Sequence, residues 1–178
     1  MANSKRIVWI DIETSGIEPT EETILEVALI ITDRDLNILE ETPPVVIHQP
    51  DEVLDNMDLW CLNTHGKSGL IDECRASDLS MKEADELLAF VVDEYSVGGK
   101  LPLGGNSVHF DRAFIKVHMP RLFRSFHYRN IDVSTLYELY TRWCPERITN
   151  DIIAHRALDD IRRSVEYLQR YREELFDK

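Results

Sequence analysis

Runs of consecutive apolar residues near the start of the chain predict buried strands. Ile7-Val8-Trp9-Ile10 is the first run, and residues 23–32 (TILEVALIIT) form a second one that is rich in branched side chains. Branched and aromatic side chains favour strands, and a continuous apolar run is typical of a strand that is covered on both faces. Residues 45–47, after a pair of prolines, predict a third, short strand. The first part of the chain is therefore expected to build a buried sheet.

Apolar residues spaced three and four positions apart predict helices in the rest of the chain. Residues 51–62 have helical character, and Ser80 followed by Glu83 has the spacing of a capping box at the start of a helix. Three more helices are expected over residues 109–119, from Ser134 or Thr135 to Trp143, and over about residues 157–176.

Two further strands are expected between these helices. Residues 101–103 look like a short strand that breaks into a turn at Gly104 and Gly105, and residues 131–133 predict the last strand. Three strands followed by helices that alternate with two more strands indicate an α/β fold with a mixed, five-stranded central sheet flanked by helices. The 178 residues contain no internal repeat and no low-complexity segment. We therefore expect one domain over residues 1–178, with its core at about 6–176.

The composition is that of a globular protein with a strong negative charge. Hydrophobic residues make up 43% of the chain, charged residues 30%, and the formal net charge is -13. A protein that tracks a long nucleic acid neutralises many phosphates with Lys and Arg, so this charge argues against a long polyanion as the partner. A very short nucleic acid is still compatible with it. The most basic stretch, residues 121–129, is interpreted as a solvated face.

The chain gives no sign of a membrane or an oxidising compartment. No apolar stretch approaches the roughly 20 residues that cross a bilayer, and the first residues lack the apolar core of a secretory signal. We therefore expect no membrane contact and a cytoplasmic location. The three cysteines, Cys61, Cys74 and Cys144, show no paired spacing. Neither a disulfide framework nor a thiolate zinc site is expected.

Two carboxylates stand at the end of the first predicted strand. Strand alternation places Asp11 and Glu13 on the same face, so both can face one ion. Farther along, Asp111 opens a predicted helix, and His155 and Asp160 flank the start of the last one. Carboxylate oxygens suit Mg²⁺ or Mn²⁺, and two such ions roughly 3.5–4 Å apart can clamp a phosphodiester displacement. A histidine, whose pKa usually lies near neutrality, could then accept a proton from water.

Each of these residues has an ordinary structural interpretation when taken alone. An acid at the end of a strand is commonly a solvated turn residue, and a lone histidine is more often a surface or packed residue than a base. Asp160 alone would be a first-turn acid that the helix dipole favours. Their joint occurrence, each at the end of the element that would carry it, favours a metal-dependent site.

Three segments resemble the motifs of the DEDDh 3′-to-5′ exonucleases, which have the ribonuclease H-like fold. The segments are WIDIETSG, GNSVHFDRAF and HRALDDI. Within the third motif, the family spacing favours Asp160 over its neighbour Asp159. The resemblance implies two divalent cations, Mg²⁺ or Mn²⁺, held by the four acids, with a histidine as the general base. The matching positions are Asp11, Glu13, Asp111, His155 and Asp160.

The resemblance extends over nearly the whole chain to a branch of this family that degrades short RNA, chiefly dinucleotides, to 5′-mononucleotides. It implies that Ile17 and Trp60 hold the terminal bases and that His65 lies near the dinucleotide, although Trp60 alone is equally compatible with a core position. It also implies a homodimer in which Tyr128 reaches the partner's site, as a catalytic or substrate-binding residue. The residues that resemble a cap on the 5′ phosphate are Ser107, Arg129, Ser134 and Thr135.

Two other functions stay open at this point. The first motif reads DIETSGI, which is closer to the ribonuclease T and polymerase-proofreading branches. A broader nuclease that trims RNA or DNA 3′ ends is therefore one alternative, although such an enzyme is expected to carry basic patches. A catalytically idle binding module is the other alternative, but a pure binder has no need of a base beside four acids.

Overall fold

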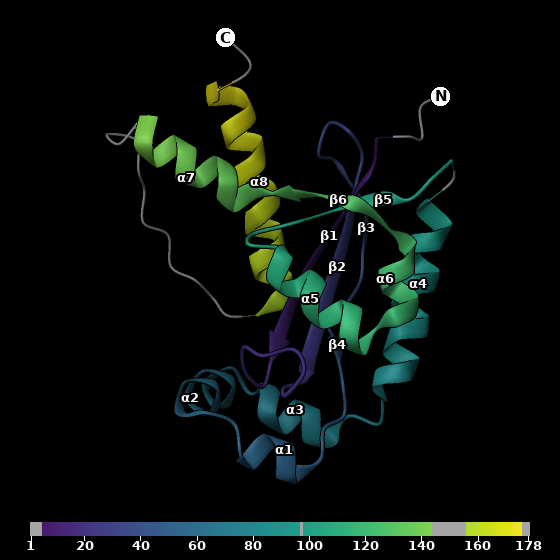
Figure 1. Cartoon of the computed structure of the whole chain (residues 1–178), viewed down its shortest axis with the longest axis vertical. Coiled ribbons are helices and arrows are strands. Elements are labelled where there is room, and N and C mark those ends of the chain that lie inside the picture. Colours follow the sequence, from purple (N-terminus) through teal and green to yellow (C-terminus); the bar gives the residue numbers. More distant parts are fainter. Residues whose placement is uncertain (1–4, 97, 144–155, 176–178) are drawn as a thin grey trace.

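A six-stranded mixed sheet forms the centre of the protein (Figure 1). The computed structural model describes residues 5–96, 98–143 and 156–175. Within them the strand order is β3-β2-β1-β5-β6, and β4 pairs with β2. β1 is antiparallel to β2 and parallel to β5, which in turn is parallel to β6. The bounds are β1 Ile7–Thr14, β2 Ile24–Thr32, β3 Ile38–Glu41, β4 Val45–Val46, β5 Leu101–Gly105 and β6 Phe126–Asp132.

This sheet confirms the predicted α/β class and corrects the number of strands from five to six. The additional strand is β3, which pairs with β2 at one edge of the sheet. Its two apolar residues, Ile38 and Leu39, are exposed, and two glutamates follow them. A short edge strand of this kind lacks the buried apolar pattern on which sequence-based assignment depends.

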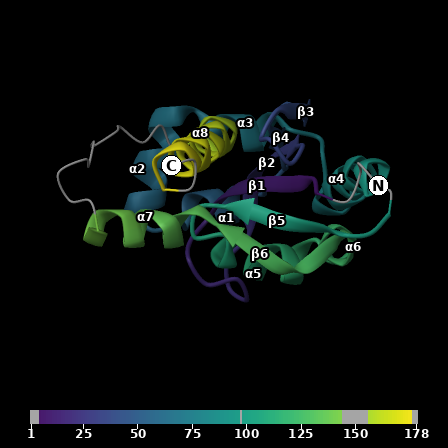
Figure 2. The same cartoon turned by 90° about the horizontal axis from the view of Figure 1, so that it is seen from above.

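Helices cover both faces of the sheet, and α8 and α5 lie on opposite sides of β1 (Figure 2). One core cluster joins Val8, Ile10 and Ile12 of β1 to α4, α5 and α6. A second cluster joins Ile7 and Trp9 to α7 and α8. Because both faces are covered, β1 and β2 are almost entirely buried, as their apolar runs predicted. The bounds are α4 Met81–Tyr95, α5 His109–His118, α6 Pro120–Ser125, α7 Val133–Trp143 and α8 Ala157–Leu175.

The helix expected over residues 51–62 is divided into two. α1 (Asp51–Asp55) ends before Asp58, whose carboxylate accepts a hydrogen bond of 2.8 Å from the N–H of Cys61 and so caps α2 (Leu59–Ser68). α3 (Leu70–Ala76) follows after Gly69. Together these short helices enclose a third apolar cluster under one end of β2.

Two of the predicted helix boundaries are confirmed. Ser80 and Glu83 form a complete capping box, in which the Ser80 Oγ accepts from the Glu83 N–H and the Glu83 carboxylate accepts from the Ser80 N–H. α8 begins and ends within one residue of its expected bounds. Pro120 does follow the end of α5, but it also stands at the first turn of α6, where its missing N–H costs nothing. No helix in the described ranges is long and apolar enough to cross a membrane.

The two glycines expected to form a turn lie inside β5 instead. A side chain at Gly104 would meet Ile7 and Trp9 at 2.9 Å, and one at Gly105 would meet the backbone oxygen of Ile10 at 2.9 Å. Glycine is needed here because β5 approaches β1 closely, rather than because the chain reverses. This contact places the end of β5 beside the residue that precedes Asp11.

The last strand and the helix after it also start differently from the prediction. β6 begins at Phe126, five residues earlier than expected. Most of these additional residues are exposed on the edge strand, so no buried apolar pattern marks them in the sequence. α7 begins at Val133, and the Asp132 carboxylate accepts a hydrogen bond of 3.0 Å from the N–H of Ser134. Asp132, rather than Ser134 or Thr135, therefore caps this helix.

Candidate active site

Three of the predicted acids meet at the end of β1. The alternation of β1 places Asp11 and Glu13 on one side of the strand, and the first turn of α8 brings Asp160 to the same place. One oxygen from each of the three carboxylates lies within 4.8 Å of the others. Residues that are about 150 positions apart in the sequence thus form one acidic cluster, as the sequence predicted.

Asp111 lies beside this cluster and is held by the backbone of β1. It is buried in the first turn of α5, and its Oδ1 accepts a hydrogen bond of 3.1 Å from the N–H of Ile12, the residue between Asp11 and Glu13. This bond fixes the Asp111 carboxylate next to the strand end that carries the other two acids. Its negative charge contributes to the raised pKa of Asp11.

Burial and mutual repulsion make the charged forms of these acids unfavourable. Burial, followed by the negative charges of Asp160 and Glu26, raises the pKa of Glu13 to about 8. Burial raises the pKa of Asp111 to about 7, although the N–H of Ile12 favours its charged form. The pKa of Asp11 is raised well above its ordinary value by burial and then by the charges of Asp111 and Glu13. Such a cluster is stabilised by a bound cation.

The donor set fits a hard divalent cation. Carboxylate oxygens are the ligands that Mg²⁺ and Mn²⁺ prefer. The two described cysteines are buried, and burial raises the pKa of Cys61 and of Cys74 to about 12, so neither is a thiolate ligand near neutral pH. Of the residues that the structure describes, the group of Asp11, Glu13 and Asp160 is the one arranged to hold a metal ion.

We expect the metal-free protein to lose stability as the pH rises. The protonated forms of Glu13 and Asp111 are favoured in the folded state, so their contribution is complete below about pH 4 and disappears as the pH passes about 7 and then about 8. Unfolding in denaturant, measured in EDTA across this range, should show the decline, and saturating Mg²⁺ should remove most of it. If the free energy of unfolding fell equally steeply with pH in EDTA and in Mg²⁺, this expectation would be contradicted.

The structure separates the adjacent acids Asp159 and Asp160. Asp160 is mostly buried, faces the acidic cluster and lies 3.5 Å from Arg163. Asp159 points away into solvent, with 56% of its side chain exposed, and pairs with Arg162 at 3.3 Å. Neighbouring positions on a helix point about 100° apart, so only one of the two can face the cluster. The choice of Asp160 from the motif spacing agrees with this geometry.

The expected base, His155, lies outside the described residues, but the next residue is firmly held. Arg156 donates to the fully buried carboxylate of Glu26 at 2.6 Å and to Glu73 at 2.9 Å. The N–H of Ala157 donates to the same Glu26 carboxylate at 3.1 Å. In the antiparallel register of β1 and β2, Glu26 lies opposite Glu13. This network could not be predicted from the sequence, because its members are as much as 131 positions apart.

Removing Arg156 should destabilise the protein strongly. The variant Arg156→Ala leaves the buried charge of Glu26 without its cationic partner, and breaking a buried pair in this way typically costs about 3–5 kcal/mol. Arg162→Ala is the matched control, because it breaks a more exposed pair with Glu41 and should cost less than about 1 kcal/mol. Unfolding in urea measures both. A similar loss for the two variants would show that Glu26 does not depend on Arg156.

A cavity of about 380 Å³ opens beside Glu13 and contains three of the predicted substrate residues. Ile17 and Trp60 line it and are 83% and 58% exposed, which excludes a core position for Trp60. His65 is buried, donates from Nε2 to the Thr14 carbonyl at 3.0 Å, and has its Nδ1 3.9 Å from Glu13. Phe110 also lines the cavity. Phe110 directly precedes Asp111 but was not among the predicted site residues.

A polar group lies where β5 and β6 end. The N–H of Ser107 donates to Ser134 Oγ at 2.8 Å and to Asp132 Oδ1 at 3.0 Å, and the two serine hydroxyls are 3.2 Å apart. Ser107 has a φ of 49°, an uncommon backbone conformation for a residue other than glycine. Thr135 is exposed in the first turn of α7. Three of the four predicted phosphate-capping residues are thus on neighbouring segments, and Asp132 holds two of them, Ser107 and Ser134.

Tyr128 and Arg129 are not brought to the acidic cluster by their own chain. Both are exposed on the edge strand β6, where the Arg129 guanidinium lies 5.4 Å from the centre of the Tyr128 ring. Tyr128 precedes Asp132 by four positions, which is about 13 Å along a strand. Within the described ranges, no hydrogen bond or ion pair links either residue to Asp11, Glu13 or Asp160.

Comparisons with known proteins point to one enzyme family. Residues 8–168 match the model of the exonuclease family RNase_T. The chain is 50% identical over 177 residues to an oligoribonuclease of Colwellia psychrerythraea, which covers 98% of this chain and 97% of that protein. It is 47% identical over 176 residues to the oligoribonuclease of Bordetella pertussis, with 98% and 97% covered. A probable oligoribonuclease of Dictyostelium discoideum is 45% identical over 174 residues, with 97% and 92% covered.

Solved structures support the fold. A zinc-bound complex of Escherichia coli exonuclease I with single-stranded DNA superposes with a TM-score of 0.75 at 18% identity, over 96% of this chain and 41% of that one. Exonuclease I of Methylocaldum szegediense gives a TM-score of 0.65 at 20% identity, over 98% and 41%. This chain therefore spans about two fifths of those exonucleases, and the likeness supports the ribonuclease H-like fold.

Proposed function

This chain belongs to the oligoribonuclease family of exonucleases, and we propose that it hydrolyses very short RNA, chiefly dinucleotides, to 5′-mononucleotides. It is a 3′-to-5′ exoribonuclease. The observation that carries the proposal is the acidic cluster at the end of β1, whose Glu13 also lines the cavity that contains Ile17, Trp60 and His65. A hydrolytic centre and a base-sized apolar surface thus share one site.

Asp11, Glu13, Asp111 and Asp160 would hold two divalent cations, Mg²⁺ or Mn²⁺. When bound, the cations would supply charge to polarise the attacking water and to neutralise the leaving oxygen. The four acids would keep the cations at the end of β1, where the N–H of Ile12 fixes Asp111. His155 would accept a proton from the attacking water, and the pairs between Arg156, Glu26 and Glu73 hold the chain next to it.

Short substrates fit the surroundings of the cluster. Ile17 and Trp60 would hold the terminal bases, since stacking on an aromatic ring is worth about 1–3 kcal/mol per base and tolerates any base. Ser107, Ser134 and Thr135, with Arg129, would meet the 5′ phosphate at the start of α7, where N–H groups favour anions. The formal net charge of -13 supports a substrate with few phosphates.

The enzyme would act in the cytoplasm as a homodimer of single exonuclease domains. The position of Tyr128 supports this, because 74% of its surface is exposed on an edge strand. It also lies four positions before Asp132, the end of β6, and so away from the end of the sheet that carries the cluster of its own chain. In a dimer, Tyr128 would reach the partner's site and contact the substrate phosphate. Arg129, which stacks on the Tyr128 ring, would move with it.

A broader nuclease of the ribonuclease T kind is the second candidate. It is favoured by residues 11–17, which read DIETSGI. Such an enzyme would trim RNA or DNA 3′ ends of any length, which the net charge disfavours.

Comparing cleavage of a 5′-labelled dinucleotide with that of a ten-nucleotide RNA, each with and without Mg²⁺, separates these functions. We expect rapid Mg²⁺-dependent cleavage of the dinucleotide and much slower cleavage of the longer strand. Equal rates would favour the broader nuclease. Binding of the dinucleotide without cleavage in any divalent metal would instead indicate a binding module.

A further inference from the structure

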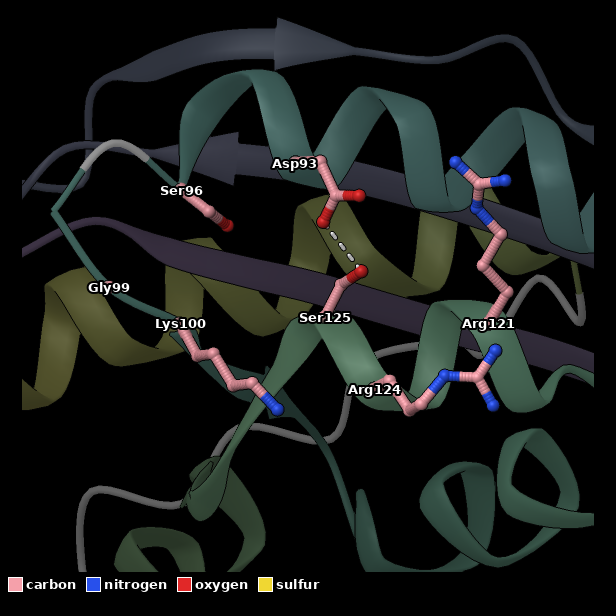
Figure 3. Close-up of a pocket in the computed structure, with 7 residues that line it drawn as sticks. All are labelled: Asp93, Ser96, Gly99, Lys100, Arg121, Arg124 and Ser125. Atoms are coloured by element: carbon pink, nitrogen blue, oxygen red, sulfur yellow. Dashed lines mark hydrogen bonds between the residues drawn. The ribbon is translucent and has the colours of Figure 1, made fainter.

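A second cavity, also of about 380 Å³, lies between α4, α6 and the residues that precede β5. Figure 3 shows the residues that line it: Asp93 near the end of α4 and Ser96 just after it, Arg121, Arg124 and Ser125 from α6, and Gly99 and Lys100 from the segment before β5. This volume is at the lower end of the roughly 300–1,000 Å³ of small-molecule pockets. It has room for a ligand of nucleotide size.

The charge of this cavity is opposite to that of the protein. Three cations and a single acid line it, whereas the whole chain has 20 basic and 33 acidic residues. In the part of the chain that the structure describes, no ion pair involves Lys100, Arg121 or Arg124. By contrast, Arg75 and Arg156 each pair with more than one carboxylate. All three side chains are exposed and solvated, and such a concentration of unpaired positive charge on an acidic protein attracts small anions.

The acid that lines the cavity, Asp93, forms no ion pair with the three cations in the described residues, so the lining has a net positive charge. The Ser125 hydroxyl donates to Asp93 Oδ1 at 2.7 Å, which joins the ends of α4 and α6 (Figure 3). At the other end of α6, the N–H groups of Arg121 and Leu122 donate to Asp85 of α4 at 3.0 and 2.7 Å. Both ends of α6 are thus fixed, and the two arginines are presented from a rigid wall.

From this arrangement we propose that the cavity binds the phosphate group of a small phosphorylated molecule of about nucleotide size. Two guanidinium groups and an ammonium provide charge and several N–H donors for phosphate oxygens, and the Ser96 hydroxyl adds a polar group beside them. The stretch of residues 121–129, which the sequence alone suggested to be a solvated face, thereby gains a binding role for its first half.

This site is separate from the acidic cluster. Lys100 stands before the first residue of β5, whereas the acidic cluster lies beyond the opposite end of that strand, where Gly105 contacts Ile10. α6 continues directly into β6, so a ligand on Arg124 lies close in sequence to Tyr128. Because the cavity and the acidic cluster lie at opposite ends of β5, the amide signals of Ser96, Gly99 and Lys100 can report on the cavity separately from the cluster.

Residue-resolved NMR titration of the full chain in Mg²⁺ buffer at constant ionic strength tests the proposal. Inorganic phosphate, adenosine 5′-monophosphate and adenosine serve as probes. We expect phosphate and the monophosphate to shift the amide signals of Ser96, Gly99 and Lys100 in a saturable way, and adenosine to leave them unchanged. Shifts caused equally by adenosine, or no shift with either phosphate probe, would overturn the proposal.

A double variant and a charge-matched control complete the test. Arg121→Gln with Arg124→Gln should weaken phosphate binding at these amides at least tenfold. Lys82→Gln with Lys116→Gln removes the same charge from exposed positions of α4 and α5 and should leave the affinity within about twofold. An equal loss in both double variants would show that net charge, rather than the cavity, attracts phosphate. Unchanged binding in the arginine variant would also overturn the site.

Discussion

Replacing Asp160 with asparagine is expected to lower the rate of dinucleotide hydrolysis by at least about a thousandfold, whereas replacing Asp159 should have almost no effect. The loss corresponds to about 4 kcal/mol of transition-state stabilisation, which is in the range that a catalytic metal ion supplies. Asp160 contributes an oxygen to the acidic cluster, while Asp159 pairs with Arg162 in solvent. The two residues are adjacent on α8, so the variants are matched in charge, size and helix position.

The kcat of each variant, measured under saturating dinucleotide and Mg²⁺, checks this expectation. Thermal unfolding in EDTA provides the control for folding. Asp160→Asn should be at least as stable as the unaltered protein, because it removes one of the repelling carboxylates. A loss of activity in Asp159→Asn equal to that in Asp160→Asn would contradict the assignment, as would full activity in Asp160→Asn.

Replacing His155 with alanine is expected to lower kcat by about 10²–10⁴-fold while leaving dinucleotide binding nearly unchanged. A general base acts on the attacking water and contributes little to the binding of the substrate. The rate of the unaltered enzyme should rise with pH as the histidine loses its proton, and the variant should lack this rise. His48→Ala, which removes an exposed histidine, is the control.

Equilibrium binding of a dinucleotide in Ca²⁺, combined with a pH–rate profile, distinguishes a base from a structural residue. If His155→Ala weakens binding as much as it lowers the rate, His155 contributes to the substrate site rather than to proton transfer. An unchanged rate would remove it from the mechanism altogether.

Elements with strong local signals could be predicted from the sequence. The apolar runs identified β1 and β2, and the capping box at Ser80 identified the start of α4. β3 could not be predicted, because its apolar residues are exposed at the edge of the sheet. Gly104 and Gly105 were misassigned to a turn, since only the close approach of β1 explains why β5 contains them.

The candidate site shows the same division between local and long-range information. The spacing of Asp11 and Glu13 predicted that both lie on one face of β1, and the spacing of the third motif favoured Asp160 over Asp159 as the acid that joins them. The link between Arg156 and Glu26 depends on tertiary pairing across 130 positions, and nothing in the local pattern marks it. The role of Asp132 in holding Ser107 and Ser134 was missed for the same reason.

The dependence of dinucleotide hydrolysis on divalent metal tests most directly whether the acidic cluster is the hydrolytic centre. The measurement is the initial rate of hydrolysis while Mg²⁺ is titrated into protein that has been freed of metal with EDTA. We expect no hydrolysis before Mg²⁺ is added, a rise to full activity as the cluster fills, and no rise in Asp160→Asn. Hydrolysis that persists at full rate in excess chelator would contradict a metal-dependent centre formed by Asp11, Glu13, Asp111 and Asp160.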